Sequence, residues 1–559
     1  MNVSLLQRSL QQAEVLRAQG HAGAAEDLAR RLVAEVPGFA AGWNLLGVLH
    51  VDAGRQLQAA DAFERAAVLS PQDATYAANL GELLRRAGLA ERAAQFCQRA
   101  LAIDDQHAGA RLNLGYALLD SGQNDAALVH FQWLVEREPG NASAWFGLAR
   151  IRMAQQNFAL ALDNLQRCAA LNPNDPEVAL AMAQSLRRLG RTTTAQEQAQ
   201  RAATLLPGHP AIVCVQADLL LEQARPDAAE ACIRAALRPG APLPAGLLYR
   251  LALCRLTHAD YIEGFALFES RLHLNQADIS NPIARPLLPM PMWQGEPLQG
   301  KRLLVLTEQG YGDHIQFCRF VPRLAALGAQ VLLGVGPPLE DLMRGLAGVH
   351  GIVTQIEDAR GSGCDYWTFV ASLPHRLRVD AAGVGTDGPY LQADAARRTA
   401  WRERLQAMAP GQTRRIGLVW GGRPENEYER RRAVPLADLQ ALAQVPGVRF
   451  VSLQMGPMAR QIDAGALPLE VLREDELGSF ADTAALMCEL DAVVSVDTAF
   501  AHLAGALGRP VHLMLPVGPD WRWGLNSDRS IWYPSVRLHR QTQAGQWGDV
   551  VQRVAAALE

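Results

Sequence analysis

The chain has 559 residues, of which 49% are apolar and 20% are charged, and its formal net charge is -4. That length exceeds what one hydrophobic core serves, so several domain-sized units are expected. The acidic surplus argues against a dedicated nucleic-acid binder. No run approaches the roughly twenty apolar residues that span a bilayer, and the first residues lack the apolar core of a signal peptide. Eight scattered cysteines without a C-x-x-C pair indicate buried thiols, so we expect a cytoplasmic protein.

The first half of the chain repeats with a period of 34 residues. Alanine holds that spacing seven times, from Ala25 to Ala229, and prolines and Leu-Gly pairs such as Leu46-Gly47 follow it in the same register. Small residues let the two helices of a repeat approach closely, and proline ends the second helix. The pattern resembles the tetratricopeptide repeat over about residues 6–243 and predicts an all-α superhelix of about seven repeats.

A repeat array of this kind uses its concave groove to hold an extended peptide or a partner protein. Asn79 and Asn113 each stand directly before a Leu-Gly pair, and we expect both to point into that groove. They resemble the asparagines that hold the substrate backbone in the protein O-GlcNAc transferase. The alternative is that both are simply solvated on an exposed helix face.

The chain changes character after the repeats. Two helices predicted at Leu247–Leu256 and Tyr261–Leu274 cap the array, and the five prolines of residues 275–300 predict a linker. Beyond residue 300, short β-rich runs alternate with helical segments, which predicts parallel sheets with crossover helices. The alternation breaks around residues 381–410 and then restarts. The predicted domains are 1–243 (repeats), 244–300 (caps and linker), 301–395 (first Rossmann-like unit) and 396–559 (second Rossmann-like, donor-binding unit).

The strands and helices expected after residue 300 can be given by their ranges. The predicted strands are Leu303–Thr307, Val331–Val335, Tyr366–Val370, Ile416–Trp420, Arg449–Gln454, Ala492–Val496 and Val511–Leu515. The predicted helices include Ile315–Leu327, 436–443, 481–489 and 499–507.

Glycines follow the first of these strands. Gly310 and Gly312 permit a tight turn and a close approach of a ligand, and the helix that follows offers free N–H groups to an anion. The alternative is an ordinary strand-to-helix turn with Asp313 as its cap.

A second motif begins where the predicted strand Ala492–Val496 ends. Asp497 and Thr498 precede a helix of small residues, whose N-terminus suits a phosphate or diphosphate. His502 follows Thr498 by four residues and therefore shares its helix face.

Together these motifs resemble the bacterial heptosyltransferase family. More closely, the chain resembles bacterial proteins in which a tetratricopeptide array precedes a heptosyltransferase-like domain, some of which are implicated in flagellin glycosylation. The resemblance implies a GT-B module of two Rossmann-like units after the superhelix. The blocks that carry it include Trp293-Gln294-Gly295-Glu296, Gln309-Gly310-Tyr311-Gly312-Asp313, Ser372-Leu373-Pro374, Gly417-Leu418-Val419-Trp420, Ser452-Leu453-Gln454 and Asp520-Trp521-Arg522-Trp523.

The resemblance also implies roles for residues. Asp313 matches the general base that deprotonates the acceptor hydroxyl, which then attacks the anomeric carbon with inversion. Arg432 is the arginine of the Arg430–Arg432 run that we expect near the donor phosphates, where its charge replaces a metal. The residues assigned to donor binding are Gly310, Gly312, Trp420, Arg432, Gln454, Asp497, Thr498 and His502.

Some features depart from the family pattern. The basic residues near the second-unit strand are arginines where the family usually offers a lysine, and Gly421-Gly422 follows Trp420. The identity of the donor nucleotide therefore cannot be inferred from the family. No His, Cys and Asp cluster has metal-ligand spacing, so neither a metal nor a cofactor is expected besides the nucleotide-sugar as co-substrate.

Three functions compete on the sequence alone. The leading prediction is a protein O-glycosyltransferase whose repeats recruit the acceptor, with flagellin the best candidate and Ser or Thr the target. The second is a non-catalytic repeat scaffold with a degenerate transferase-like domain. The third is a transferase that acts on lipid or polysaccharide, which the absence of a basic amphipathic helix disfavours.

Overall fold

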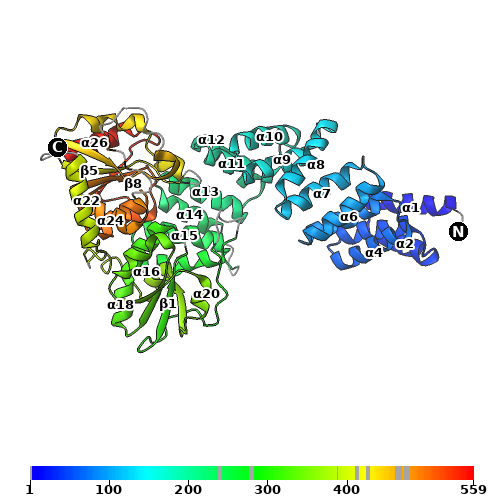
Figure 1. The fold of residues 1–559 in the computed structure, drawn as a ribbon. Coiled ribbons are helices and arrows are strands. Elements are labelled where there is room, and N and C mark those ends of the chain that lie inside the picture. Colours follow the sequence, from blue (N-terminus) through cyan, green and yellow to red (C-terminus); the bar gives the residue numbers. More distant parts are fainter. Residues whose placement is uncertain are drawn as a thin grey trace. The chain divides into compact units, whose positions relative to one another are not determined.

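The computed structural model describes residues 3–236, 242–275, 283–308, 310–386, 388–408, 414–423, 428–459, 469–470, 472 and 477–559 (Figure 1). The chain divides into two compact units, Met1–Leu205 and Leu206–Glu559. Each unit has hydrophobic clusters of its own. The domain boundaries expected at residues 243, 300 and 395 stay predictions.

The first unit is a stack of paired helices, as the 34-residue period predicts. All seven alanines of the periodic series are fully buried along the chain. A Cβ on Gly47 would lie 2.5 Å from the ring of Phe63, so only glycine lets these two helices pack at this distance. The helices of this unit are α1 (Val3–Ala18), α2 (Ala22–Glu35), α3 (Ala40–Asp52), α4 (Gln56–Leu69), α5 (Ala74–Arg86), α6 (Ala90–Ile103), α7 (Ala108–Asp120), α8 (Asn124–Arg137), α9 (Ala142–Ala154), α10 (Phe158–Leu171), α11 (Pro176–Arg188) and α12 (Thr192–Leu205).

The second unit begins with the end of the repeat series. Its first helices are α13 (Pro210–Glu222), α14 (Pro226–Ala235), α15 (Ala245–Thr257) and α16 (Tyr261–Phe268), followed by the 3-10 helix η1 (Glu269–His273). The helices predicted at Leu247–Leu256 and Tyr261–Leu274 are thus present. Leu256, Phe265 and Phe268 are buried in the same cluster as the first sheet, so these helices share its core.

The first sheet has four parallel strands in the order β3-β2-β1-β4. Leu303, Leu304 and Val305 of its central strand are fully buried, as expected for a strand covered on both faces. Its elements are β1 (Arg302–Leu306), α17 (Tyr311–Phe317), η2 (Cys318–Phe320), α18 (Val321–Ala326), β2 (Gln330–Gly334), η3 (Pro337–Leu339), α19 (Glu340–Arg344), β3 (Val349–Val353), α20 (Ile356–Arg360), β4 (Tyr366–Phe369), η4 (Val370–Ser372) and α21 (Leu373–Arg376).

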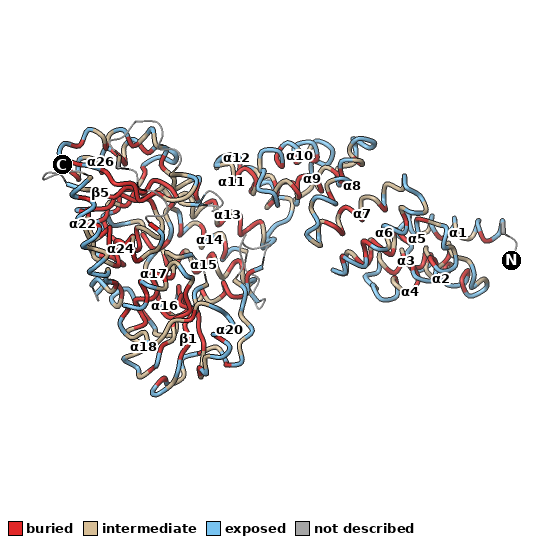
Figure 2. Tube along the Cα trace, viewed as in Figure 1, coloured by how far each residue is buried: buried red, intermediate tan, exposed pale blue. Residues whose placement is uncertain are grey.

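The second sheet has six parallel strands in the order β10-β9-β8-β5-β6-β7. Figure 2 shows the buried interior that these strands form together with the helices around them. Its elements are α22 (Ala395–Met408), β5 (Arg414–Val419), α23 (Glu429–Arg432), η5 (Leu436–Gln444), β6 (Val448–Ser452), β7 (Leu469–Glu470), α24 (Phe480–Cys488), β8 (Ala492–Val496), α25 (Ala499–Ala506), β9 (Val511–Leu515), η8 (Trp521–Trp523), β10 (Val536–Arg540) and α26 (Gly548–Leu558).

The predicted fold class, an all-α superhelix followed by an α/β module of two Rossmann-like units, is confirmed. Helix α22 lies within residues 381–410, where the alternation of strands and helices breaks, and it buries only Trp401 and Leu405. The described part of the predicted linker, residues 283–300, contacts the first sheet, since Met292 forms a β-bridge to Trp367 and Trp293 is buried in the core.

Candidate functional site

The predicted site residues lie after the carboxyl ends of parallel strands, where the strand order reverses. In the first sheet the reversal lies between β1 and β4, and in the second between β5 and β8. Open α/β sheets bind ligands at such places. Asp313 lies on α17, which follows β1, and Asp497 directly follows β8. Helices α17 and α25 pack against each other, so the two strand ends meet at one site.

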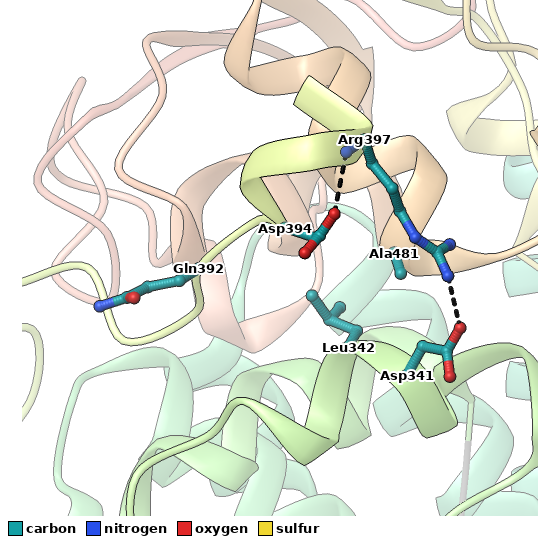
Figure 3. A pocket seen from close by; sticks show the side chains of 6 residues that line it. All are labelled: Asp341, Leu342, Gln392, Asp394, Arg397 and Ala481. Carbon is teal, nitrogen blue, oxygen red and sulfur yellow. Dashed lines mark hydrogen bonds and ion pairs between the residues drawn. The ribbon is translucent and has the colours of Figure 1, made fainter. Parts of the chain in front are cut away.

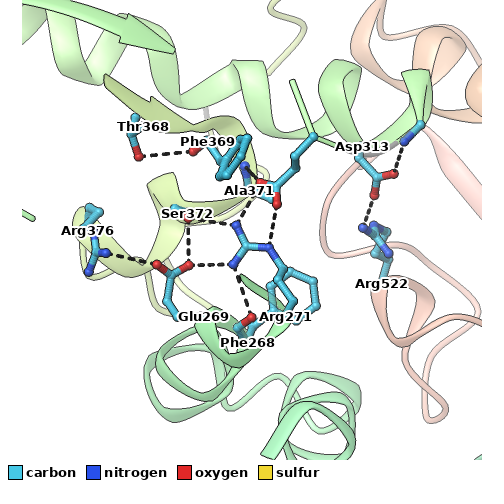
Figure 4. A network of polar contacts seen from close by, with 12 residues as sticks. Phe268, Glu269, Arg271, Asp313, Thr368, Phe369, Ala371, Ser372, Arg376 and Arg522 are labelled. Atoms are coloured by element: carbon cyan, nitrogen blue, oxygen red, sulfur yellow. Dashed lines mark hydrogen bonds and ion pairs between the residues drawn. The ribbon is translucent and has the colours of Figure 1, made fainter. Parts of the chain in front are cut away.

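Asp313 makes two contacts with its carboxylate. Its Oδ2 accepts a hydrogen bond of 3.1 Å from the backbone N–H of Gly310, which caps α17. Its Oδ1 accepts from Nη2 of Arg522, and Figure 4 shows this ion pair. Burial raises the pKa of Asp313, and the charge of Arg522 opposes that rise. Asp313 therefore does cap the helix, as the predicted alternative has it. Its second carboxylate oxygen, however, pairs with Arg522, which follows a strand of the other sheet.

Arg522 is a site residue to which the sequence assigned no role. It comes from η8, after β9, and it is buried. Its Nη1 donates to Oδ1 of Asp520 at 2.8 Å and its Nε donates to Oε1 of Gln316 at 2.5 Å. Arg522 thus joins the second sheet to α17 of the first. The block Asp520-Trp521-Arg522-Trp523 marked the place, but a pairing across 209 residues is not visible in a sequence.

Asp497 and His502 form the second side of the site. Burial raises the pKa of Asp497 to about 6, Asp520 adds to the rise, and Arg432 and Arg522 oppose it. Burial lowers the pKa of His502 well below its usual value, so the ring is neutral. Its Nδ1 lies 3.0 Å from the hydroxyl of Tyr533, and its Nε2 lies 3.7 Å from Oδ1 of Asp497.

Thr498 is the N-cap residue of α25, as the motif predicts. Its side chain makes no capping hydrogen bond, and its hydroxyl lies 3.4 Å from that of Ser495. The residue is partly exposed. A hydroxyl at a helix start, next to backbone N–H groups, has the chemistry to bind a phosphate oxygen.

Arg432 also reaches this site, whereas its neighbour Arg431 turns elsewhere. Its Nη1 donates a 2.7 Å hydrogen bond to the backbone oxygen of Asp497, and its Nε pairs with Oε2 of Glu429 at 2.8 Å. Nη2 of Arg431 lies 3.6 Å from Oε1 of Glu222 on α13. The structure therefore brings Arg432, Asp497, His502, Arg522 and Asp313 into one group.

Trp420 and Gln454 lie beside this group, and both are buried. The Trp420 side chain is fully buried in the second sheet's core. The Gln454 amide forms hydrogen bonds with the backbone. Its Oε1 accepts from the N–H groups of Trp420 and Gly421 at 3.0 Å each. Its Nε2 donates to the Gly421 oxygen at 3.0 Å. These two residues shape the turn after β5, and their assigned donor contact stays a prediction.

The two glycines after β1 differ in what they do. Gly310 is exposed and supplies the N–H that Asp313 accepts. A Cβ on Gly312 would lie 2.9 Å from Cδ2 of His502 and 3.5 Å from Cα of Ala499. Because the His502 ring is held by Tyr533, it cannot yield easily, so Gly312 is what lets α17 approach α25.

The two asparagines of the repeats belong to the first unit. Nδ2 of Asn79 donates to Oδ1 of Asn44, on the preceding repeat, at 2.7 Å. Asn113 is half-buried, and its amide has no hydrogen-bond partner among the residues that the structure describes. Their role toward an acceptor stays a prediction.

A buried ionic network lies next to the site, after β1 and β4 (Figure 4). Arg271 of η1 donates from Nε and Nη2 to the two carboxylate oxygens of Glu308, at 2.8 Å each. It also pairs with Glu269 at 2.6 Å and donates to the Ser372 hydroxyl at 2.8 Å. Glu308 precedes the glycine loop, so this network fixes the end of β1 to the helices that follow the repeats.

A hollow of about 380 Å³ lies elsewhere in the second unit (Figure 3). Arg397 crosses it and pairs with Asp341 at 2.7 Å and with Asp482 at 2.9 Å. The residues that line it are Asp341, Leu342, Gln392, Asp394, Arg397 and Ala481. None of them belongs to the group around Asp313, so we place the candidate site at that group and not in this hollow.

His314, beside Asp313, predicts a loss of stability in acid. It is fully buried, neither ring nitrogen has a partner in the described part of the chain, and burial lowers its pKa from 6.5 to about 4. The unfolded chain therefore binds more protons than the folded one between these values, so stability falls as pH drops from 6.5 toward 4. In urea unfolding, the free energy of unfolding of the variant His314→Leu should exceed that of the wild type by about 1.4 kcal/mol more for each pH unit that the pH falls within this range. A pH-independent difference between the two proteins would contradict this.

The model of the tetratricopeptide repeat matches residues 10–74, 50–108, 112–176 and 214–272. These segments are tetratricopeptide repeats. The last match runs from α13 into η1, so the repeat series continues into the second compact unit.

One curated relative and several solved structures are similar to this chain. Protein FlbA of Caulobacter vibrioides is 30% identical over 355 residues, which are 59% of this chain and 58% of FlbA. The match thus spans less than two thirds of that relative. YrrB, a TPR protein with an unusual peptide-binding site, is 22% identical and covers 30% of this chain and 85% of its own, with a TM-score of 0.26. Pseudomonas aeruginosa PilF is 20% identical and covers 36% of this chain and 93% of its own, with a TM-score of 0.33.

Among the described residues, no helix has both the length and the apolar character needed to cross a membrane. Over the same residues, no three His, Cys, Asp or Glu side chains gather in a way that would hold a metal ion.

Proposed function

We propose that the chain is an inverting, metal-independent O-glycosyltransferase that moves a sugar from a nucleotide-sugar to Ser or Thr of a protein. The observation that carries the proposal is the meeting of Asp313 from the first sheet with Asp497, Thr498, Arg432 and Arg522 from the second. Those groups combine two largely buried carboxylates, those of Asp313 and Asp497, with two arginines and the N-terminus of α25. A base and a phosphate site in one place are what sugar transfer from a nucleotide requires.

The reaction uses these groups as follows. Asp313 takes the proton of the acceptor hydroxyl, and the hydroxyl oxygen forms a bond to the anomeric carbon. The bond between that carbon and the donor phosphate oxygen breaks, and its electron pair stays on the nucleotide. Arg432 and Arg522 stabilise the charge that develops on the leaving phosphate, and Thr498 with the start of α25 holds it.

Arg522 keeps Asp313 ready for this role. An arginine is always charged, so its pairing with Oδ1 favours the ionised carboxylate even though burial disfavours it. Arrival of a second anion, the donor phosphate, gives Arg522 a new partner. Asp313 then keeps its hydrogen bond from Gly310 and gains basicity as the pairing with Arg522 weakens.

The acceptor follows from the repeats. Tetratricopeptide arrays bind proteins, and this one continues into the unit that holds the site. Flagellin is the acceptor that the family resemblance favours, and the similarity to FlbA gives a relative in which to look for the same activity.

Thermal unfolding with nucleotides tests the donor site. We expect one of UDP, GDP, ADP or CMP, or a sugar derivative of it, to raise the melting temperature by several degrees, since a ligand at about 100 times its Kd stabilises by about 2.7 kcal/mol. The rise should vanish in Thr498→Ala, which lacks the hydroxyl, and persist in the matched control Thr498→Ser. Mass spectrometry of flagellin, after incubation with this protein and that nucleotide-sugar, then tests whether the sugar is transferred. No rise with any nucleotide would favour the scaffold function instead.

A further inference from the structure

Helix α15, which lies within the last matched repeat segment, borders the candidate site. It packs against η8, the short helix that carries Arg522. The loop after β9 also meets the end of α13, because a Cβ on Gly518 would lie 2.4 Å from the backbone oxygen of Glu222. The end of the repeat series thus forms one wall of the site.

Buried ion pairs hold α15 and its neighbours in place. Nε and Nη2 of Arg250 donate to the two carboxylate oxygens of Asp218 on α13, at 2.8 and 2.9 Å. Arg271 fixes η1 to Glu308 in the same bidentate way. A side chain on α15 next to Arg250 therefore has a defined position relative to β1 and its loop.

Tyr249 is that side chain. Its ring packs against Phe268, with the ring centroids 5.6 Å apart, and the residue is partly exposed. Its hydroxyl has no hydrogen-bond partner within the described ranges, and its helix packs against η8, which carries Arg522. Burial, and next the charge of Asp520, raises the pKa of Tyr249 to about 12, so the phenol is neutral and can both donate and accept.

We propose that Tyr249 is an acceptor-binding residue, whose hydroxyl hydrogen-bonds the polypeptide segment that presents its Ser or Thr to Asp313. The proposal deepens the proposed function and names the side from which the protein enters. A partly exposed phenol without a hydrogen-bond partner among the described residues, on a helix that packs against η8, suits a peptide, whose backbone offers both N–H and C=O groups at each residue. The residue also comes from the repeat series and from neither sheet, whereas Asp497, Thr498 and Arg432 on the donor side all follow strands of the second sheet.

Photocrosslinking tests the contact without needing catalysis. The full chain with Tyr249 replaced by p-benzoylphenylalanine is irradiated with flagellin as the acceptor probe, and the crosslinked flagellin peptide is mapped by mass spectrometry. We expect crosslinks to a segment with Ser or Thr, and none above background from the matched position Tyr366 on β4, a partly buried tyrosine of the first sheet.

Kinetics with Tyr249→Phe separate acceptor binding from donor binding. Loss of one hydroxyl should raise the KM for flagellin about 10-fold, while the nucleotide-induced rise in melting temperature and the KM for the nucleotide-sugar stay within 2-fold of wild type. Tyr366→Phe should change neither KM. A merely structural role of Tyr249 would instead lower the melting temperature and affect both substrates alike.

The outcomes distinguish this inference from the proposed function. Crosslinks at Tyr249 without any sugar transfer by the wild type would support the acceptor contact and overturn the transferase. Transfer by the wild type without crosslinks at Tyr249, or with an unchanged KM for flagellin in Tyr249→Phe, would overturn the acceptor contact alone. Neither crosslinks nor transfer would overturn both.

Discussion

The Asp313→Asn variant should transfer sugar about 10²- to 10⁴-fold more slowly than the wild type, which is the range that a general base contributes. Asparagine can still accept the hydrogen bond from the Gly310 N–H, so α17 keeps its cap. It cannot take the acceptor proton. We therefore expect kcat to fall, the nucleotide-induced rise in melting temperature to persist, and the acidic limb of the pH–rate profile to disappear. Steady-state release of nucleotide in the presence of flagellin measures all but the melting temperature.

The same substitution elsewhere provides the control for Asp313. Asp341→Asn removes one charge from the hollow that Arg397 crosses, away from the site, and should leave kcat within about 2-fold. If Asp313→Asn also stayed within that range, Asp313 would be no more than a helix cap and a partner of Arg522. The turn would then be an ordinary strand-to-helix turn capped by Asp313.

Periodicity made the repeats and the sheet strands predictable. The 34-residue series depends on small and large residues at fixed spacing, and both kinds occupy the positions that the spacing implies, as Gly47 and Phe63 show. The strands Ala492–Val496 and Val511–Leu515 match β8 and β9 residue for residue, because each is a short, mostly apolar run, interrupted only by Ser495 and His512, that is buried on both faces. By contrast, β3 (Val349–Val353) and β10 (Val536–Arg540) are partly exposed and mixed in composition, so no run marked them.

The site was predictable by residue type but not by pairing. The motifs pointed to Asp313, Asp497 and His502. The structure brings these three together because each follows a strand at the point where the strand order of its own sheet reverses, and helices α17 and α25 pack against each other there. Which cation faces the base was not predictable, since Arg522 lies 209 residues from Asp313. Nor does the sequence show that Trp420 turns into the core.

Removal of the Arg271 guanidinium should destabilise the second unit more than any other single change considered for this chain. Arg271→Ala leaves the Glu308 carboxylate buried without its bidentate partner, and breaking a buried pair in this way costs about 3–5 kcal/mol. The loss affects Glu269 less, because its carboxylate keeps its ion pair with Arg376 at 3.0 Å. Backbone hydrogen exchange in β1 and β4 should therefore become about 10²- to 10³-fold faster, since a factor of ten corresponds to about 1.4 kcal/mol.

Two further variants show whether the bidentate geometry is the cause. Arg344→Ala breaks an exposed pair with Glu340 on α19, in the same sheet unit, and should cost no more than about 0.5 kcal/mol. Arg271→Lys keeps the charge but not the planar fork, so its exchange rates should lie between those of the wild type and Arg271→Ala. Equal rates in Arg271→Ala and Arg344→Ala would mean that the network contributes little. The end of β1 would then owe its position to the apolar packing of Phe265 and Phe268 beneath it.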